Sequence, residues 1–216
     1  MNPELSLAQI RTTRIITVMR GDFPPDNAIA VCEVLLGEGL NIVELTYNSP
    51  DWREALPAVL EAFKDTDLLV GMGTVLNPAQ VNEALDLGAQ FLVSPALNPA
   101  SVSTAHAAGV LMAPGIATPT EAAVAASYGC KLLKLFPADP LGLAYFKTMR
   151  SALDSFDFTC NGNMHTGNIG DFLAAGATAC GLAGNGLAGN GNRPLSEIKA
   201  IAQDVAAIVK DAAPLA

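Results

Sequence analysis

The chain has 216 residues, half of them hydrophobic, and a formal net charge of −9. This length suits one well-buried domain, so we expect residues 1–216 to form a single domain. The acidic balance argues against nucleic acid or an anionic membrane surface as the main partner, because both need clustered lysine and arginine. No apolar run reaches the roughly 20 residues that span a bilayer, and the first residues lack the basic start and apolar core of a signal peptide. We therefore expect a soluble, cytoplasmic protein.

Cysteine and histidine are too sparse for a metal centre or a disulfide framework. The four cysteines lie far apart in apolar sequence and form no C-x-x-C pair, which favours buried thiols. The two histidines are also far apart, so a His-rich divalent metal site is not expected. The residues concerned are Cys32, Cys130, Cys160, Cys180, His106 and His165.

Eight short apolar or β-branched segments alternate with helical segments along the chain. We predict strands at 14–19, 41–45, 68–70, 91–94, 110–113, 131–136, 156–160 and 179–182. Their starts lie roughly 20 to 27 residues apart, the length of a strand, a crossover helix and two short loops, which implies a parallel sheet. Eight such units in a chain of this size close most naturally into a (β/α)8 TIM barrel.

The segments between these strands have helix-forming composition. We predict helices at 25–38, 50–63, 78–87, 99–108, 119–128, 140–153, 166–175 and 195–211, and a short N-terminal helix at 4–11. Six of the eight begin with proline, whose missing N–H has no partner in a first helical turn, and several are followed by glycine. The glycine- and asparagine-rich segment 181–192 is predicted either to present backbone N–H groups to an anion or to be mobile.

Two charged residues, Glu44 and Lys134, fall inside predicted strands. The interior of such a barrel is filled with apolar side chains and active groups lie at the C-terminal strand ends, so both residues stand out. Strand alternation places Lys134 on one face with Leu132 and Phe136. Enclosure by these apolar neighbours penalises the charged amine, which lowers its pKa and leaves a nucleophilic neutral fraction.

Such an amine can attack a ketone and form an imine, and the protonated imine is an electron sink that lets a neighbouring carbon–carbon bond break. Glu44 would carry protons between the intermediates. The ordinary alternatives are a lysine whose stem packs while its amine reaches water, and a glutamate that only forms a salt bridge, for instance to Lys134. The pairing of both groups in a fold whose strand ends converge favours the catalytic interpretation.

Several motifs, in matching order and spacing, resemble the 2-keto-3-deoxy-6-phosphogluconate (KDPG) and 2-keto-3-deoxy-6-phosphogalactonate (KDPGal) aldolases. The similarity extends over nearly the whole chain. The motifs are Val18-Met19-Arg20-Gly21, Val43-Glu44-Leu45-Thr46, Gly71-Met72-Gly73-Thr74-Val75-Leu76-Asn77-Pro78, Ser94-Pro95, Pro114-Gly115-Ile116-Ala117-Thr118 and Lys134-Leu135-Phe136-Pro137-Ala138.

The resemblance implies a role for each matching residue. Lys134 would form the Schiff base with a small keto acid substrate, and Glu44 would be the acid/base. The expected substrate-binding residues on the pyruvate side, including those that hold its carboxylate and line its pocket, are Arg20, Thr46, Gly73, Thr74, Pro114 and Phe136. The family also implies a homotrimer with neither a metal nor an organic cofactor.

The sequence departs from the family where the distal end of the substrate would bind. The usual Gly-Gly pair after the seventh strand and the serine after the eighth are both absent, and Asn48 replaces an arginine of the gluconate branch. Backbone amides in the last two loops can still bind phosphate, because these loops commonly do so in barrels. We therefore predict a distal site at Asn161, Gly162, Asn163, Gly184 and Asn185, and we expect His165 to be a solvated loop residue.

Four functions follow from this pattern. The leading hypothesis is a class I aldolase that cleaves KDPG, or its galactonate epimer, to pyruvate and glyceraldehyde 3-phosphate. The altered loops leave open a non-phosphorylated substrate such as 4-hydroxy-2-oxoglutarate. The Glu44 and Lys134 pair argues against a non-enzymatic barrel that merely binds a keto acid. The histidine count disfavours a metal-dependent aldolase.

Overall fold

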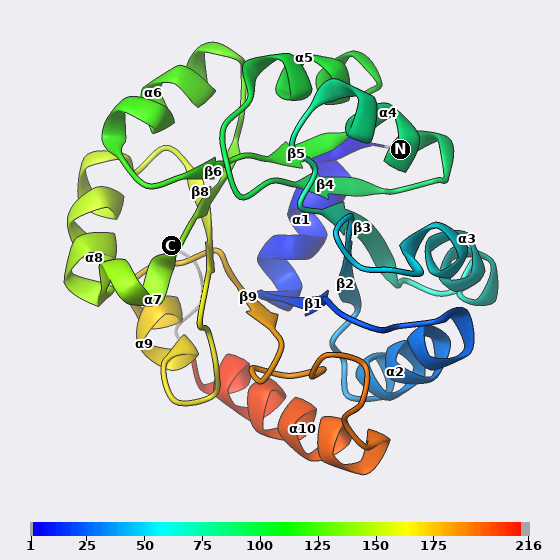
Figure 1. Cartoon of the computed structure of the whole chain (residues 1–216). Coiled ribbons are helices and arrows are strands. Elements are labelled where there is room, and N and C mark those ends of the chain that lie inside the picture. The colour runs from blue at the N-terminus through cyan, green and yellow to red at the C-terminus, as the bar shows by residue number, and fades with distance from the viewer. Residues whose placement is uncertain (1, 213–216) are drawn as a thin grey trace.

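A closed parallel barrel forms the centre of the molecule. The computed structural model describes residues 2–212. Its strands pair in the order β5-β4-β3-β2-β1-β9-β8-β7-β6, and the two outermost strands are consecutive in the chain, so the sheet closes on itself (Figure 1). The strands are β1 (Ile15–Met19), β2 (Ile42–Thr46), β3 (Leu69–Gly73), β4 (Phe91–Val93), β5 (Leu111–Ala113), β6 (Gly115–Ile116), β7 (Leu132–Leu135), β8 (Asp157–Asn161) and β9 (Ala179–Ala183).

The predicted (β/α)8 barrel is confirmed, with one strand divided at Pro114. β5, within the strand predicted at 110–113, pairs with β4, and β6, just beyond that prediction, pairs with β7, so two short pieces serve both neighbours. Proline has no N–H to give to a sheet, which accounts for the break. Its carbonyl still accepts a hydrogen bond of 2.9 Å from the Lys134 N–H, so the barrel stays closed at this point.

Helices surround the barrel, as Figure 1 shows. They are α2 (Pro25–Gly37), α3 (Trp52–Ala62), α4 (Pro78–Asp86), α5 (Pro99–Ala107), α6 (Pro119–Ser127), α7 (Ala138–Leu141), α8 (Leu143–Ala152), α9 (Ile169–Ala174) and α10 (Leu195–Asp211), preceded by α1 (Pro3–Thr13). Among the residues described, no helix has the length and apolar character needed to cross a membrane.

Several predicted boundaries were wrong. The helix expected at 140–153 is two helices, because Gly142 adopts a φ of 90°, which a helix does not contain. The helix expected from residue 166 begins only at Ile169, because the Asn168 side chain bonds the His165 N–H and the Asn163 carbonyl and shapes a turn there. The third strand extends to Gly73, and the first begins only after Arg14, which has a left-handed φ of 62° at the end of α1.

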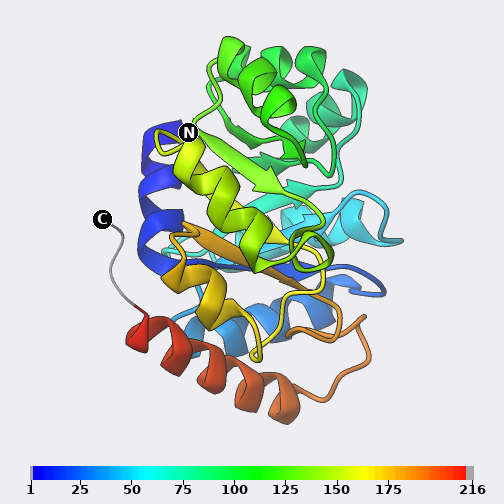
Figure 2. The same cartoon turned by 90° about the vertical axis from the view of Figure 1, so that its left-hand side faces the viewer.

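Helix α1 closes the N-terminal end of the barrel. Its buried side chains Leu7 and Ile10 join the apolar cluster that fills the interior, and Figure 2 shows the helix lying across this end. The strand residues of this cluster alternate along each strand, as inward positions must. They are Ile16, Val18, Ile42, Leu69, Phe91, Val93, Leu111, Ala113, Leu132 and Ala179.

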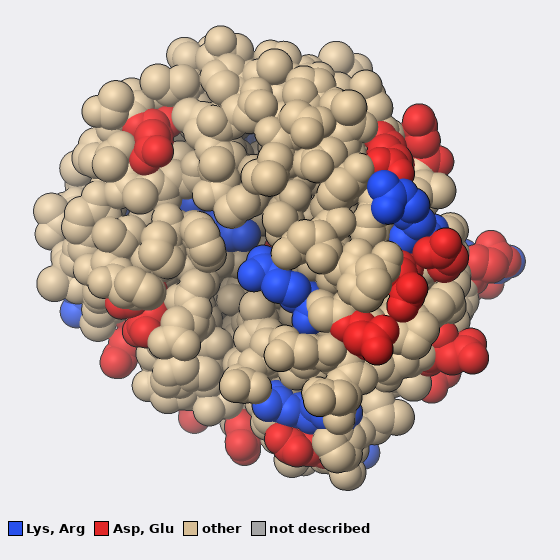
Figure 3. All heavy atoms as spheres, viewed as in Figure 1, with Lys and Arg blue, Asp and Glu red and all other residues tan. Residues whose placement is uncertain are grey.

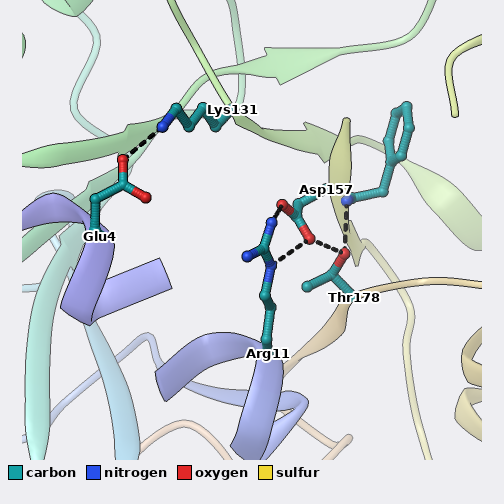
Figure 4. Close-up of polar contacts among 6 residues, drawn as sticks. Glu4, Arg11, Lys131, Asp157 and Thr178 are labelled. Atoms are coloured by element: carbon teal, nitrogen blue, oxygen red, sulfur yellow. Dashed lines mark hydrogen bonds and ion pairs between the residues drawn. The ribbon is translucent and has the colours of Figure 1, made fainter. Parts of the chain in front are cut away.

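Ion pairs fasten α1 to the strands that it covers. Lys131 Nζ lies 2.6 Å from Glu4 Oε1, and Arg11 grips Asp157 through two hydrogen bonds of 3.0 and 2.6 Å (Figure 4). Asp157 also accepts a hydrogen bond of 2.9 Å from the Thr178 hydroxyl. The lysine and arginine are more than half exposed, and exposed pairs of this kind contribute about 0–1 kcal/mol each. Apolar burial therefore does most to hold α1.

We predict that Leu7→Ala lowers the free energy of unfolding by about 2–5 kcal/mol, because it removes a buried side chain from the closed end of the barrel. Leu5→Ala is the matched control on the same helix, since Leu5 is 68% exposed and its removal should change stability by less than about 0.5 kcal/mol. Urea denaturation of both variants measures the difference. Equal effects would contradict this role for α1.

Candidate active site

The barrel interior brings Glu44 and Lys134 together, as the sequence predicts. Ile42 and Leu132 belong to the interior cluster, so Glu44 and Lys134, two residues further along β2 and β7, also face inward. Glu44 has no exposed surface and Lys134 is 3% exposed. Each shifts the pKa of the other through its charge, so the two groups lie within electrostatic reach.

Glu44 is a buried carboxyl group that no protein group satisfies. Neither of its carboxyl oxygens has a hydrogen-bond partner among residues 2–212, so the salt-bridge alternative is not realised. Burial raises the pKa of Glu44, and the charges of Lys134 and Arg20 oppose that rise. A Cβ atom at Gly73 would lie only 1.7 Å from Glu44 Oε1, so a glycine on β3 is what leaves room for the carboxyl group.

Lys134 is almost fully buried, with 3% of its surface exposed, so its amine reaches solvent only through the cavity that it lines. Burial lowers the pKa of Lys134, the Glu44 charge opposes this effect, and the Arg20 charge adds to it. The Nζ atom lies 5.2 Å from the centre of the Phe136 ring. Desolvation therefore enlarges the neutral, nucleophilic fraction of this amine.

Arg20, directly after β1, lies beside this pair. Its guanidinium Nη2 donates a 3.5 Å hydrogen bond to the Thr74 hydroxyl. Thr74 has a left-handed φ of 61°, a backbone conformation that is uncommon for a β-branched residue and often occurs at functional sites. The charge of the arginine acts on the pKa of both Glu44 and Lys134, so its guanidinium lies within electrostatic reach of each buried group.

A pair of hydroxyl groups holds the loop that carries Arg20. The Gly21 N–H donates a 3.0 Å hydrogen bond to Ser49 Oγ, which lies 2.8 Å from Thr46 Oγ1. Thr46 has no exposed surface and Ser49 is buried, so this link joins the loop after β1 to the end of β2. The hydroxyl of Thr46, a predicted substrate-binding residue, is thus occupied by a protein partner.

Two adjoining cavities lie at this end of the barrel, and Lys134 is in the wall of the smaller one. The first, of about 280 Å³, has Lys134, Arg20, Phe136, Asn161, Gly162 and Asn163 in its wall. The second, the distal cavity, has about 570 Å³ and is lined by Arg20, Asn163, Met164, His165, Ala183, Gly184, Asn185, Gly186 and Asn190. Because both walls include Arg20, Asn163 and Ala183, the cavities are neighbours. Figure 3 shows basic side chains in the hollow at the centre of this face, whereas the acidic side chains lie toward its outer edge, beside further basic ones.

The predicted site residues fall into two groups. Eight of them form cavity walls: Arg20, Lys134, Phe136, Asn161, Gly162, Asn163, Gly184 and Asn185. Glu44, Thr46, Gly73, Thr74 and Pro114 lie outside the walls of these two cavities. Glu44 and Gly73 pack against each other, Thr74 contacts Arg20, and Pro114 contacts the Lys134 backbone, so this second group surrounds the wall residues.

The loops after β8 and β9 present backbone donors. Asn161 is buried and accepts a 2.9 Å hydrogen bond from the Thr159 hydroxyl. Beyond it, Gly162, Asn163 and Gly184 have positive φ values of 102°, 57° and 53°. Within residues 2–212, the N–H groups of Gly162, Asn163 and Asn185 make no hydrogen bond outside the strand ladders, whereas Gly184 pairs with Gly189 in an antiparallel bridge. Successive free N–H groups in such loops favour an anion.

The structure adds three residues to the site. Ser49 directly follows Asn48, and only its hydrogen bond to the Gly21 N–H reveals its connection to Arg20. Asn190 belongs to the glycine- and asparagine-rich segment whose composition indicated anion binding. His165 is exposed as expected, but it also lines the distal cavity, and its Nδ1 accepts a 3.0 Å hydrogen bond from the Gly167 N–H.

Comparisons with known proteins agree with this geometry. Residues 7–202 match the family described as "KDPG and KHG aldolase". The 2-dehydro-3-deoxy-6-phosphogalactonate aldolase of Escherichia coli (strain K12) is 34% identical over 197 residues, which cover 91% of this chain and 93% of that protein.

Two solved structures are similar over most of the chain. One, described as "Native KDPGal structure", has a TM-score of 0.84 and 28% identity, and the match covers 92% of this chain and 95% of that chain. The other is a cube-shaped, porous cage designed by fusing symmetric oligomeric domains, with a TM-score of 0.86, 30% identity and coverage of 92% and 73%. The family resemblance is thus confirmed: the chain belongs to the KDPG and KHG aldolase family and is a pyruvate-dependent aldolase, a lyase that acts on a carbon–carbon bond.

Proposed function

We propose that the chain cleaves a six-carbon 2-keto-3-deoxy sugar acid 6-phosphate, KDPG or its galactonate epimer, to pyruvate and glyceraldehyde 3-phosphate. The observation that carries this proposal is the buried pair of Lys134 and Glu44, whose carboxyl group has no protein hydrogen-bond partner. A buried polar group without a partner is costly, and substrate atoms would supply the missing partner.

In the first stage Lys134 would form the Schiff base. The neutral amine attacks the C2 ketone of the substrate, the resulting carbinolamine loses water, and a protonated imine forms. Burial favours this step because it lowers the pKa of Lys134. Glu44, whose pKa is raised by burial, can hold the proton that the departing hydroxyl group takes up.

In the second stage Glu44 would act as the base. It takes the proton of the C4 hydroxyl group, the C3–C4 bond breaks, and its electron pair moves to C3 as the imine becomes an enamine. The three-carbon aldehyde leaves. Glu44 then returns the proton to C3, and hydrolysis of the imine releases pyruvate and restores the lysine. One carboxyl group thus serves in both directions, which suits its position beside Lys134.

The remaining residues would orient the substrate. Arg20 is the cation beside the reacting pair and would hold the keto acid carboxylate together with Thr74. The N–H groups of Gly162, Asn163 and Asn185, beside the turn at Gly184, would bind the phosphate group of the aldehyde half. The related Escherichia coli protein is named for a phosphorylated sugar acid, which supports this choice.

A second candidate keeps the chemistry and changes the aldehyde half. Among the residues of the distal cavity wall, only Arg20 carries a fixed positive charge, and the family description also includes KHG aldolase. A non-phosphorylated substrate such as 4-hydroxy-2-oxoglutarate, which gives pyruvate and glyoxylate, would therefore use the same Lys134 and Glu44. The two candidates differ only in what occupies the distal cavity.

Reduction with borohydride in the presence of pyruvate should attach one pyruvate-derived group to Lys134, because this amine is buried and has a lowered pKa. Peptide mapping locates the adduct. Lys131 is the internal control, since it lies three residues earlier, is exposed and is paired with Glu4. An adduct on Lys131, or cleavage of KDPG without any adduct, would show that the Schiff-base assignment is wrong.

Glu44→Gln should reduce turnover of the phosphorylated substrate by about 10² to 10⁴, because an amide of similar shape cannot transfer the protons. The buried oxygen positions of Glu44 form no hydrogen bonds that the amide would break, so the variant should fold. Circular dichroism and steady-state kinetics test both statements. Normal turnover in the folded variant would exclude Glu44 as the acid/base.

We also propose that the protein is a homotrimer, as the family resemblance implies. The designed cage that contains a similar chain was made by fusing symmetric oligomeric domains, which supports self-association. Light scattering should then give a mass near three times the 22.3 kDa of one chain. A monomer at every concentration tested would refute the proposal.

A further inference from the structure

Asn190 and Gly191, in the glycine- and asparagine-rich segment after β9, pack against the loop that carries Arg20. The Asp22 N–H donates a 3.0 Å hydrogen bond to the Asn190 carbonyl, and the Asn27 side chain donates a 2.8 Å hydrogen bond to the Gly191 carbonyl. A Cβ atom at Gly21 would lie 2.5 Å from the Asn190 carbonyl oxygen. Likewise, a Cβ at Gly191 would lie 1.7 Å from the Asp22 carbonyl oxygen. The backbone position of Asn190 is therefore set by close contacts.

The side chain of Asn190, by contrast, is free. It is exposed and makes no hydrogen bond with any other residue in the described range 2–212. It lines the distal cavity with Arg20 and with residues 183–186. Its Oδ1 atom lies 3.4 Å from the position that a Cβ would take at Gly184, so the amide group lies beside the loop after β9. A fixed backbone with an unpartnered amide at a binding cavity is a preorganised hydrogen-bonding group.

The charges around this amide favour an anion. The wall of the distal cavity contains Arg20, His165 and amide side chains, and none of its residues is acidic. The nearby carboxylate of Asp139 is occupied, since Asn163 and Asn168 donate hydrogen bonds of 2.6 and 3.1 Å to its two oxygens. Asn190 can donate through its Nδ2 without bringing a negative charge to the cavity.

We propose that Asn190 is a specificity-determining residue, whose amide group donates a hydrogen bond to the phosphate of the aldehyde half. The inference rests on the proposed function, because it assumes a phosphorylated substrate bound with its keto acid end at Lys134. It adds a side-chain donor to the backbone donors of Gly162, Asn163 and Asn185. It also links recognition of both substrate ends, because the loop that holds Asn190 is the one docked beside Arg20.

The test changes the charge of residue 190 while it keeps the shape of the side chain. Asn190→Asp replaces the donor with a carboxylate that repels phosphate, and Asn190→Ala removes the donor alone. Asn192→Asp is the matched control, since Asn192 is exposed in the same segment and outside the cavity wall. The specificity constant kcat/KM is measured for each protein with the 6-phosphate and with the unphosphorylated sugar acid, and pyruvate trapping on Lys134 reports an intact site.

The wild-type chain should prefer the phosphate ester. Asn190→Ala should lower kcat/KM for this ester about 10- to 100-fold, the usual effect of one hydrogen bond to a charged group, and Asn190→Asp should lower it further. Both variants should act on the unphosphorylated compound within about threefold of wild type, and Asn192→Asp should resemble wild type, because an exposed charge is screened by salt.

Two results would overturn the proposal, and they differ in meaning. If the wild-type chain prefers the unphosphorylated compound, the phosphorylated substrate is wrong and the inference falls with it. If the wild-type chain prefers the ester but Asn190→Asp and Asn192→Asp behave alike, the proposed function stands and Asn190 has no part in specificity. Equal losses on both substrates in the Asn190 variants would likewise show that this residue does not recognise phosphate.

Discussion

The burial of two ionisable side chains that do not pair directly is the constraint on which the site depends. Glu44 and Lys134 lie inside a barrel whose interior is otherwise mostly apolar, so each loses hydration when it is charged. A close salt bridge would have offset part of that cost, but the Glu44 oxygens have no partner. Burial therefore raises the pKa of Glu44 and lowers the pKa of Lys134, so both values move toward neutral pH. Groups that transfer protons in enzymes typically have pKa values shifted in this way.

Glycines on the adjacent strands leave room for these polar groups. Gly73 leaves the space that the Glu44 carboxyl group fills, and Gly181 does the same for the Asn161 amide, whose Nδ2 lies 1.9 Å from where a Cβ would be. Below this level, the interior is packed with branched side chains and sealed by Leu7 and Ile10. Rigidity at one end therefore supports an open, polar cavity at the other, as is usual for barrel enzymes.

The loops around the cavity are held by backbone contacts, which keeps their side chains available. The Gly21 N–H is hydrogen-bonded to the Ser49 hydroxyl, and Gly21 packs closely against the Asn190 backbone. Both contacts restrain the loop that carries Arg20. Gly162, Asn163 and Gly184 have positive φ values, which turn the chain sharply at the ends of β8 and β9. Donors that are already held in place favour binding, because less entropy is lost when the ligand binds.

The sequence alone determined the barrel, because the repeat of strand, proline-started helix and glycine is a local signal that needs no long-range information. It also identified Lys134 and Glu44, since a charged residue within an apolar strand conflicts with its surroundings. The division of the fifth strand at Pro114, the kink at Gly142 and the turn before α9 were missed, because they depend on neighbouring strands and on side-chain contacts such as those of Asn168. Only the tertiary structure showed that the Glu44 carboxyl group lacks a hydrogen-bond partner and that the Thr46 hydroxyl is bonded to the Ser49 hydroxyl. It also showed that the Asn190 side chain lies beside Gly184. These features join residues from different loops, and the geometry of such contacts arises when the barrel closes and is not encoded in the spacing of residues along the chain.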